Sequence, residues 1–452
     1  MALSPAATVA APGTDDPYPR GRALAAAAEK VIPGGVNSGT RFVGEPYGFA
    51  DAQGPRITDV DGHTYLDYHA AFGAILLGHN AEPVNRAVTE AIGRVDLTGL
   101  GVTPIEVELA ERVSSVIPSV ESMIATMSGS EATAQAIRLS RAVTGRQHVI
   151  KFQGGFHGWH DAVARNVIST RERAYGTDPL SRGILPEAIA STLIAEFNDL
   201  SSVQALFDEH DDQIACIILE PIPHNVGALL PTTEFVNGLR ELCSRTGTVL
   251  IFDEVITGFR HALGGYQEVL GVTPDLTTFG KGMANGHPIG GLGGRRELMD
   301  HFDGRTGDVL MAGTFNGHPL ACAAALATID HLAENPDFYT RTHALGERMR
   351  TGLDAIIAEL GISAYTSGFG GVFNVYFTPR QPSGYRDLLD NDNAAYVAFH
   401  REMTQRGHLM LPMALKRNHV SGAHTADDVE QTLAAAHEVL GLMAGDGRLV
   451  RS

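Results

Sequence analysis

The sequence predicts an α/β protein in which a large, doubly wound domain with a mostly parallel sheet is joined by a smaller α/β domain from both chain ends. Two continuous apolar runs that each end in carboxylates, at residues 214–220 and 248–254, are typical of parallel strands buried on both faces. The length of 452 residues allows two domains. We place the large domain at residues 60–325. Residues 1–59 form a tail and part of the small domain, and residues 326–452 form the rest of it.

Composition and charge restrict the partners of this chain. Its formal net charge is −18 at pH 7, and nucleic acids and anionic membranes repel such a protein. Residues 1–19 are rich in alanine and proline and lack the pattern of a secretory signal, and no segment is as long and apolar as a membrane span. Cys216, Cys243 and Cys322 stand singly, without disulfide or metal spacing. We therefore expect a soluble, cytoplasmic protein with a loose N-terminal tail.

Two segments near the N-terminus contain turn signals. Residues 32–41 are rich in glycine and end in Arg41, which by its sequence alone is typical of a surface charge. Residues 57–67 contain an Asp61-Gly62 pair between two short strand-like runs, which predicts a β-hairpin. The hairpin is expected to be part of the scaffold.

A helix is predicted from Ser128-Gly129-Ser130-Glu131 to about Val143. Small residues at a helix start leave its first amides open, and the helix dipole adds partial positive charge there, so such a start binds phosphate. A plain N-cap at Ser128 would explain the same residues.

A strand predicted at residues 148–152 is followed by Phe156, His157, His160 and Asp161. The last three have a spacing that metal ligands can adopt. However, no third or fourth ligand pattern accompanies them, and we predict no metal. The glycine-rich segment 290–294 lacks the spacing of a dinucleotide-binding loop, which argues against a redox enzyme.

Lys281 lies among small and apolar residues in Thr-Thr-Phe-Gly-Lys-Gly-Met-Ala-Asn-Gly, residues 277–286. Burial favours a neutral amine, and a neutral amine forms a Schiff base with the aldehyde of pyridoxal phosphate (PLP). Asp253 closes the apolar run at 248–254. From that place its charge is suited to keep the nitrogen of a pyridine ring protonated. A glycine-flanked lysine is, by itself, more often a loop residue.

The sequence from Phe252 to Arg260, Phe-Asp-Glu-Val-Ile-Thr-Gly-Phe-Arg, followed by residues 274–281, Pro-Asp-Leu-Thr-Thr-Phe-Gly-Lys, resembles the class-III aminotransferases. The most similar subgroup contains glutamate-1-semialdehyde 2,1-aminomutase, and the resemblance extends from about Ile32 to the last helix. It implies PLP-dependent transferase fold type I, an internal aldimine at Lys281, and a homodimer with shared active sites.

The resemblance also implies roles for individual residues. Arg41 matches the arginine that holds the substrate carboxylate, and Phe156 stands where the family usually has a tyrosine stacked on the cofactor. Asn225 matches an asparagine that contacts the phenolic oxygen, and Thr314 matches a residue that binds the phosphate of the neighbouring subunit. The full set of expected cofactor contacts is Ser128, Gly129, Ser130, Phe156, His157, Glu220, Asn225, Asp253, Val255, Lys281 and Thr314.

Two departures from the aminomutase pattern affect the predicted reaction. Lys416 stands where that pattern has a glutamate, and Phe72 where it has a tryptophan. With Arg41, Lys416 would present two cations to a substrate with two carboxylates, unless Lys416 points to solvent. We therefore predict a PLP-dependent aminotransferase that acts between an amino donor and a carbonyl acceptor. The alternatives are the intramolecular aminomutase and, more remotely, an inactive binding protein of the same fold.

Overall fold

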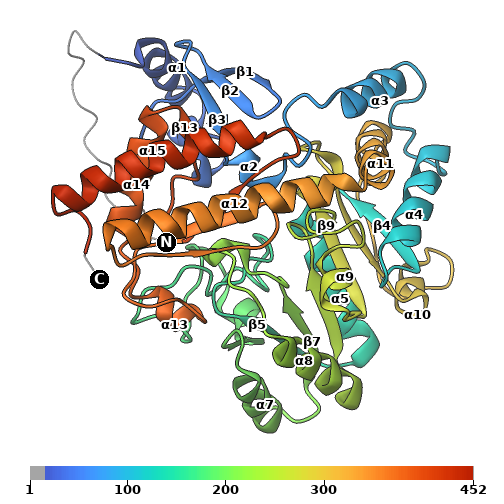
Figure 1. The fold of residues 1–452 in the computed structure, drawn as a ribbon. Helices are drawn as coiled ribbons and strands as arrows, with labels where there is room; N and C mark the ends of the chain where they lie inside the picture. The colour runs from blue at the N-terminus through green and yellow to red at the C-terminus, as the bar shows by residue number, and fades with distance from the viewer. Residues whose placement is uncertain (1–15, 451–452) are drawn as a thin grey trace.

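The structure is a computed structural model that describes residues 16–450. Its centre is a seven-stranded sheet of order β4-β10-β9-β8-β7-β5-β6 (Figure 1). Strands β6, β5, β7, β8 and β9 are parallel, whereas β10 is antiparallel to both β9 and β4. The strands are β4 (Ser122–Thr126), β5 (His148–Phe152), β6 (Thr192–Ala195), β7 (Ile214–Leu219), β8 (Val249–Asp253), β9 (Leu276–Gly280) and β10 (Gly290–Gly294). The predicted fold class is confirmed.

Every residue of β7, β8 and β9 is buried, because helices cover both faces of the sheet. On one face Ile217, Leu250 and Phe252 pack with apolar residues of the helices that flank β7, and on the other Ile218 and Ile251 pack against the helix that follows β4. The helices of this part are α3 (Glu82–Ile92), α4 (Pro104–Val116), α5 (Gly129–Thr144), α6 (Pro186–Ala190), α7 (Leu200–Glu209), α8 (Thr233–Thr246), α9 (Tyr266–Leu270), α10 (Arg296–Met299) and α11 (Pro319–Glu334). Short 3-10 turns are η3 (His224–Val226), η4 (Lys281–Ala284) and η5 (Asp300–Phe302).

The two ends of the chain pack together. Strand β13 from the C-terminal region pairs in parallel with β3, and in Figure 1 the red helices α14 and α15 lie beside the blue strands. The strands are β1 (Phe49–Gln53), β2 (Arg56–Asp59), β3 (Thr64–Asp67) and β13 (His408–Leu409) in one sheet, and β11 (Tyr365–Ser367), β12 (Val372–Tyr376) and β14 (Asn418–His419) in another. The helices and 3-10 turns are α1 (Pro19–Glu29), η1 (Pro33–Gly35), η2 (Gly39–Arg41), α2 (Ala70–Gly73), α12 (Asp337–Leu360), α13 (Tyr385–Leu388), α14 (Asn393–Gln405) and α15 (Ala426–Gly445).

Several sequence predictions can be compared with these elements. The hairpin expected at residues 57–67 is present as β2 and β3, joined through Asp61-Gly62. Of the tail expected at residues 1–19, residues 1–15 lie outside the described part. The domain boundaries stay a prediction. Among residues 16–450, no helix has both the length and the apolar character that a membrane crossing requires.

The short element α2 is a left-handed turn. Ala70, Ala71, Phe72 and Gly73 have φ angles of 49°, 49°, 59° and 84°. Each L-residue in this conformation costs roughly 1–2 kcal/mol relative to the right-handed helix. The turn places the Phe72 carbonyl against Arg417, a residue of the C-terminal part.

Candidate active site

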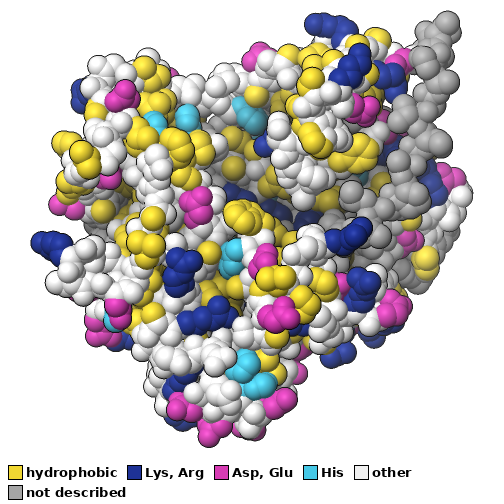
Figure 2. Space-filling model, turned by 180° about the vertical axis from the view of Figure 1, so that it is seen from behind, with side chains coloured by type: hydrophobic (Ala, Val, Ile, Leu, Met, Phe, Trp, Pro, Cys, Tyr) yellow, Lys and Arg dark blue, Asp and Glu magenta, His cyan; other side chains and the backbone are white. Residues whose placement is uncertain are grey.

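A crevice opens at the carboxyl ends of the parallel strands, where open α/β sheets bind their ligands. Asp253 ends β8, Lys281 follows β9 and Glu220 follows β7, while α5 begins at the same edge. These residues line a cavity of about 240 Å³, together with Ser128 and Phe156. The face opposite to that of Figure 1 is hollowed near its middle, and Lys and Arg side chains are visible in the hollow (Figure 2).

Asp253 is fixed by three hydrogen bonds. Its Oδ2 lies 2.7 Å from His157 Nδ1, and its Oδ1 accepts from the Thr278 hydroxyl and the Val255 amide, both at 3.1 Å. The Asp253 side chain is buried. Since His157 Nδ1 donates to the carboxylate, the histidine orients Asp253 and does not coordinate a metal through that nitrogen. In the described residues, no group of three His, Cys, Asp or Glu side chains is arranged to hold a metal ion.

The start of α5 has open amides. The Ser128 hydroxyl caps the Glu131 amide at 3.3 Å, and Glu131 Oε2 accepts from the Met127 amide at 2.8 Å. Within the described residues, the amides of Gly129 and Ser130 have no such partner. A Cβ at Gly129 would lie 2.7 Å from the Val255 side chain, so only glycine permits this approach. The cap and the phosphate-binding interpretation are therefore compatible, because Ser128 caps one amide and leaves two free.

Lys281 is half-buried and has a left-handed backbone, with φ of 44°. Burial lowers the pKa of Lys281 to about 8, and the nearby Arg417 guanidinium acts in the same direction against the carboxylates of Asp253 and Glu220. The amine is therefore neutral in a substantial fraction of molecules near pH 8. The surroundings of Lys281 therefore favour the neutral, nucleophilic form of its amine.

Glu220 connects three segments. Its Oε1 accepts from the Phe156 amide at 2.8 Å and from Asn225 Nδ2 at 3.4 Å, and its Oε2 accepts from the His224 amide at 3.2 Å. Asn225 Oδ1 in turn accepts from Lys416 Nζ at 2.8 Å. Lys416 is 7% exposed, so the interpretation that it points to solvent is wrong. Burial, reinforced by Arg417, lowers the pKa of Lys416 to about 7.

Arg417 was missed by the sequence analysis, although it adjoins Lys416. Its guanidinium is 2% exposed and donates from Nη2 to the Phe72 carbonyl at 2.7 Å and from Nε to His419 Nε2 at 3.3 Å. Arg260 is similarly buried and donates to the carbonyls of Ile256 and Gly73. Burial lowers the pKa of Arg417 to about 10 and that of Arg260 to about 9. No described carboxylate forms an ion pair with Arg260, Lys416 or Arg417.

The other predicted site residues differ in whether they line the cavity. Phe156 is partly buried in the cavity wall. Arg41 is exposed on η2 and forms no ion pair within residues 16–450, although its charge reaches His69 near the Phe72 turn. Thr314 is exposed in the loop before α11 and does not line the cavity. His287 and Ile289 also line it and had no sequence signal beyond their place after Lys281.

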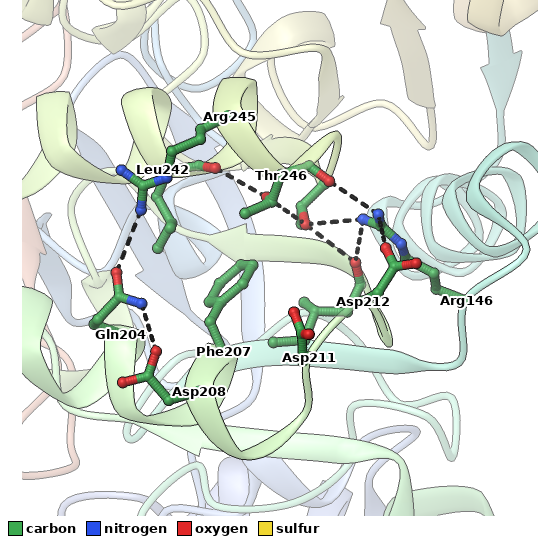
Figure 3. Close-up of a pocket in the computed structure, with 11 residues that line it drawn as sticks. Arg146, Gln204, Phe207, Asp208, Asp211, Asp212, Leu242, Arg245 and Thr246 are labelled. Carbon is green, nitrogen blue, oxygen red and sulfur yellow. Dashed lines mark hydrogen bonds and ion pairs between the residues drawn. The ribbon is translucent and has the colours of Figure 1, made fainter.

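A second cavity, of about 520 Å³, lies between α7 and α8 near the amino ends of β7 and β8 (Figure 3). Four of its five charged side chains bond to residues of its own walls. Arg146 donates to the Thr246 carbonyl and Asp212, and Gln204 connects Arg245 to Asp208. This cavity is therefore not the candidate site, since the chemistry-bearing residues meet at the opposite strand ends.

Comparisons of the sequence and the structure with known proteins identify the family of this chain. The family model for class-III aminotransferases matches residues 43–390. The chain is 38% identical over 423 residues to a glutamate-1-semialdehyde 2,1-aminomutase from Alkaliphilus oremlandii (strain OhILAs), which covers 92% of this chain and 97% of that protein. An omega-transaminase structure from Sphaerobacter thermophilus has a TM-score of 0.87 at 31% identity, covering 93% of this chain and 97% of that one. A β-phenylalanine aminotransferase from Variovorax paradoxus has a TM-score of 0.83 at 28% identity, covering 96% of both chains.

The fold and these likenesses define an enzyme of PLP fold type I. The chain belongs to the class-III aminotransferase family, whose members use PLP. The family resemblance and the cofactor inferred from the sequence are thereby confirmed.

Proposed function

We propose that the protein is an aminotransferase that moves an amino group between two separate molecules, at least one of which carries a carboxylate. The observation that supports this best is the pair of buried basic side chains Lys416 and Arg417, which form no ion pair with any described carboxylate; Arg417 also lowers the pKa of Lys281. Buried charges in proteins are normally paired. The carboxylate of an amino acid or oxo acid supplies the missing partner, and the planar guanidinium fork suits it.

The residues of the crevice fit PLP. Gly129 and Ser130 offer open amides to a phosphate at the positive end of α5, next to the Ser128 cap. Phe156 offers a ring face for stacking on a pyridine ring. Val255, His157, Glu220 and Asn225 complete the proposed contacts, and Arg41 is proposed to bind substrate from the rim. Bound PLP supplies an aldehyde that reacts with amines and a ring that accepts electrons.

Asp253 and Lys281 divide the proton chemistry between them. Asp253, held by His157, Thr278 and the Val255 amide, would stabilise a positive charge on the ring nitrogen of the cofactor. Lys281 Nζ would supply the nucleophile towards an aldehyde carbon. When free, the same Nζ would take up a proton at a substrate carbon and give one back, because its pKa of about 8 suits both directions.

We further propose that two copies of the chain complete each site. Thr314 is exposed beside the large apolar side chains Leu310 and Phe315, which are 74% and 54% exposed. A Cβ at Gly317 would lie 2.2 Å from a side-chain oxygen of Glu106 in α4, so this loop lies against the start of α4, where Leu100 and Val102 are also exposed. Apolar patches of this kind are typical of protein interfaces. Light scattering should therefore give a dimer, and Thr314→Ala should weaken PLP binding. An active monomer would contradict this proposal.

The runner-up is the intramolecular aminomutase reaction, which the 38% identical relative is named for. A half-reaction screen separates the two. The pyridoxamine form is mixed with pyruvate, 2-oxoglutarate and aldehydes, and the PLP form with alanine and glutamate, while absorbance is followed. An aminotransferase converts both forms and releases a separate product from each. Conversion of glutamate 1-semialdehyde into its isomer, with no turnover of any donor and acceptor pair, would refute the proposed function and establish the alternative.

A further inference from the structure

Asp67 is a buried carboxylate that lies outside the crevice. It ends β3 and does not line the cavity. Its Oδ1 accepts from the backbone amides of His69 and Ala70 at 2.9 and 3.0 Å, and its Oδ2 lies 2.7 Å from His79 Nε2. Charge-assisted hydrogen bonds of this kind are short and strong, and they hold the carboxylate in one orientation. Because the two amides open the left-handed turn, Asp67 fixes the point at which that turn begins.

The left-handed turn at residues 70–73 needs such support. The three residues before Gly73 all have positive φ, a conformation that L-residues avoid. A short polar side chain that bonds the amides of the residues just after it is a common way of holding a tight turn. At the other end of the turn, the Gly73 carbonyl accepts from Arg260. The strained turn is thus fixed by a carboxylate at its start and by a guanidinium at its end.

The same turn holds the guanidinium of Arg417. The Phe72 carbonyl accepts from Arg417 Nη2 at 2.7 Å, and Arg417 Nε donates to His419 Nε2 at 3.3 Å. The backbone amide of His419 donates in turn to the Tyr68 carbonyl at 2.8 Å. A Cβ at Gly73 would clash with the His419 ring, at 2.7 Å from Nε2, so the turn and this ring are in tight contact. Both hydrogen-bond partners of the guanidinium are therefore placed by the turn and the residues that lead into it.

We infer that Asp67 is a positioning residue, which orients the Arg417 guanidinium towards the carboxylate of the substrate through the left-handed turn. The inference rests on the proposed function, in which Arg417 binds that carboxylate. Without the Asp67 oxygens, two amides lose their acceptor and the turn can relax to ordinary backbone conformations. The Phe72 carbonyl then no longer holds Nη2, and a loose guanidinium must be ordered each time a carboxylate binds. Asp67 should therefore affect ligands that carry a carboxylate and not those that lack one.

Asp59 provides a matched control, because a purely structural carboxylate changes stability without changing the preference between ligands. Asp59 ends β2 in the same sheet and is also buried. It bonds the amides of Asp61 and His63 and Nδ1 of His63, much as Asp67 bonds two amides and a histidine. It also accepts from the Tyr65 hydroxyl at 2.8 Å. These partners belong to the hairpin of β2 and β3 and not to the left-handed turn, so Asp59→Ala should lower Tm and leave the preference intact.

The experiment compares Asp67→Asn, Asp67→Ser, Asp67→Ala and Asp59→Ala with the unmodified protein, all loaded with PLP. Asparagine keeps an acceptor oxygen in the place of Oδ1, serine presents an oxygen on a shorter side chain, and a methyl group presents none. Calorimetry gives the Kd of propionate, a carboxylate that has no amine to react. Stopped-flow absorbance gives the half-reaction with L-alanine and with isopropylamine, and thermal unfolding gives Tm.

For Asp67→Ala we expect the Kd of propionate and the half-saturation constant for L-alanine to rise about tenfold, while the reaction with isopropylamine changes by less than about twofold. Asp67→Ser should lose about threefold and Asp67→Asn should match the unmodified protein, so these two decide the question if Asp67→Ala does not fold.

Equal losses for the two amines, unchanged propionate binding in the Ala and Ser variants, or the same loss of preference in Asp59→Ala would overturn the inference. If the unmodified protein shows no half-reaction with any amine, the proposed function fails instead, and the propionate measurements still test the role of Asp67.

Discussion

Removal of the Arg417 guanidinium should selectively weaken substrates that carry a carboxylate. The side chain uses two of its five N–H groups, one on the Phe72 carbonyl and one on His419, which leaves three for a ligand. Two hydrogen bonds from a buried guanidinium to a carboxylate contribute about 1.5–3 kcal/mol each before the cost of desolvation. We therefore expect Arg417→Met to cost about 3 kcal/mol, or roughly 150-fold in kcat/KM.

The assay compares alanine with isopropylamine, in which a methyl group replaces the carboxylate. The kcat/KM of Arg417→Met should fall roughly 150-fold for alanine and change by less than about threefold for isopropylamine. Arg417→Lys retains the charge but loses the planar fork, and we expect a loss of about tenfold. Equal losses for the two amines would show that Arg417 supports the fold of the crevice and does not bind the carboxylate. No loss for either would assign the carboxylate to Lys416 or Arg41.

The other predictions concern the cofactor and the left-handed turn. Lys281→Ala should lose the visible absorbance of lysine-bound PLP, and an unchanged spectrum would remove this lysine from its proposed role. In the cofactor-free protein, the rate of PLP capture should rise about tenfold per pH unit up to about pH 8 and then level off, because capture requires the neutral amine; a flat profile would contradict the lowered pKa. Asp253→Asn should slow turnover by several orders of magnitude, as a charge in a dry site is worth several kcal/mol, whereas near-normal activity would place another group at the ring nitrogen. Ala71→Gly should raise Tm, because relief of roughly 1–2 kcal/mol of strain at φ 49° exceeds the roughly 0.5–1 kcal/mol that the greater freedom of glycine in the unfolded chain costs, while the control Ala26→Gly in helix α1 should lower it.

The central sheet and its strand-end residues were predictable because they leave local patterns. A strand buried on both faces must be continuously apolar, so β7 and β8 stand out in the sequence, and the carboxylate that ends such a strand is conspicuous. Asp253 and Glu220 were found in this way. Lys281 was found because a charge in an apolar surrounding contradicts the usual pattern.

The cations behind the crevice leave no comparable signal. Arg417 belongs to a short polar segment that looks like a surface loop, and only the pairing of β12 with β14 brings it to the Phe72 turn. Arg41 shows the opposite case, since its role rests on resemblance alone and the structure leaves it exposed.

The distribution of charge is compatible with the proposed binding of an anionic substrate by a strongly acidic protein. The chain carries a net charge of −18, yet Arg260, Lys281, Lys416 and Arg417 are grouped in and behind the crevice, where the carboxylates of Asp253 and Glu220 act on Lys281. Fields between exposed charges are screened within about 8–10 Å in physiological salt, whereas buried charges are screened much less. The acidic surface therefore does not govern the site, and in the proposed reaction the affinity for a carboxylate is set inside the crevice. Burial also lowers the pKa of Lys281 and Lys416, so the same desolvation that makes a cation bind an anion tightly gives Lys281 the neutral amine that amino-group transfer requires.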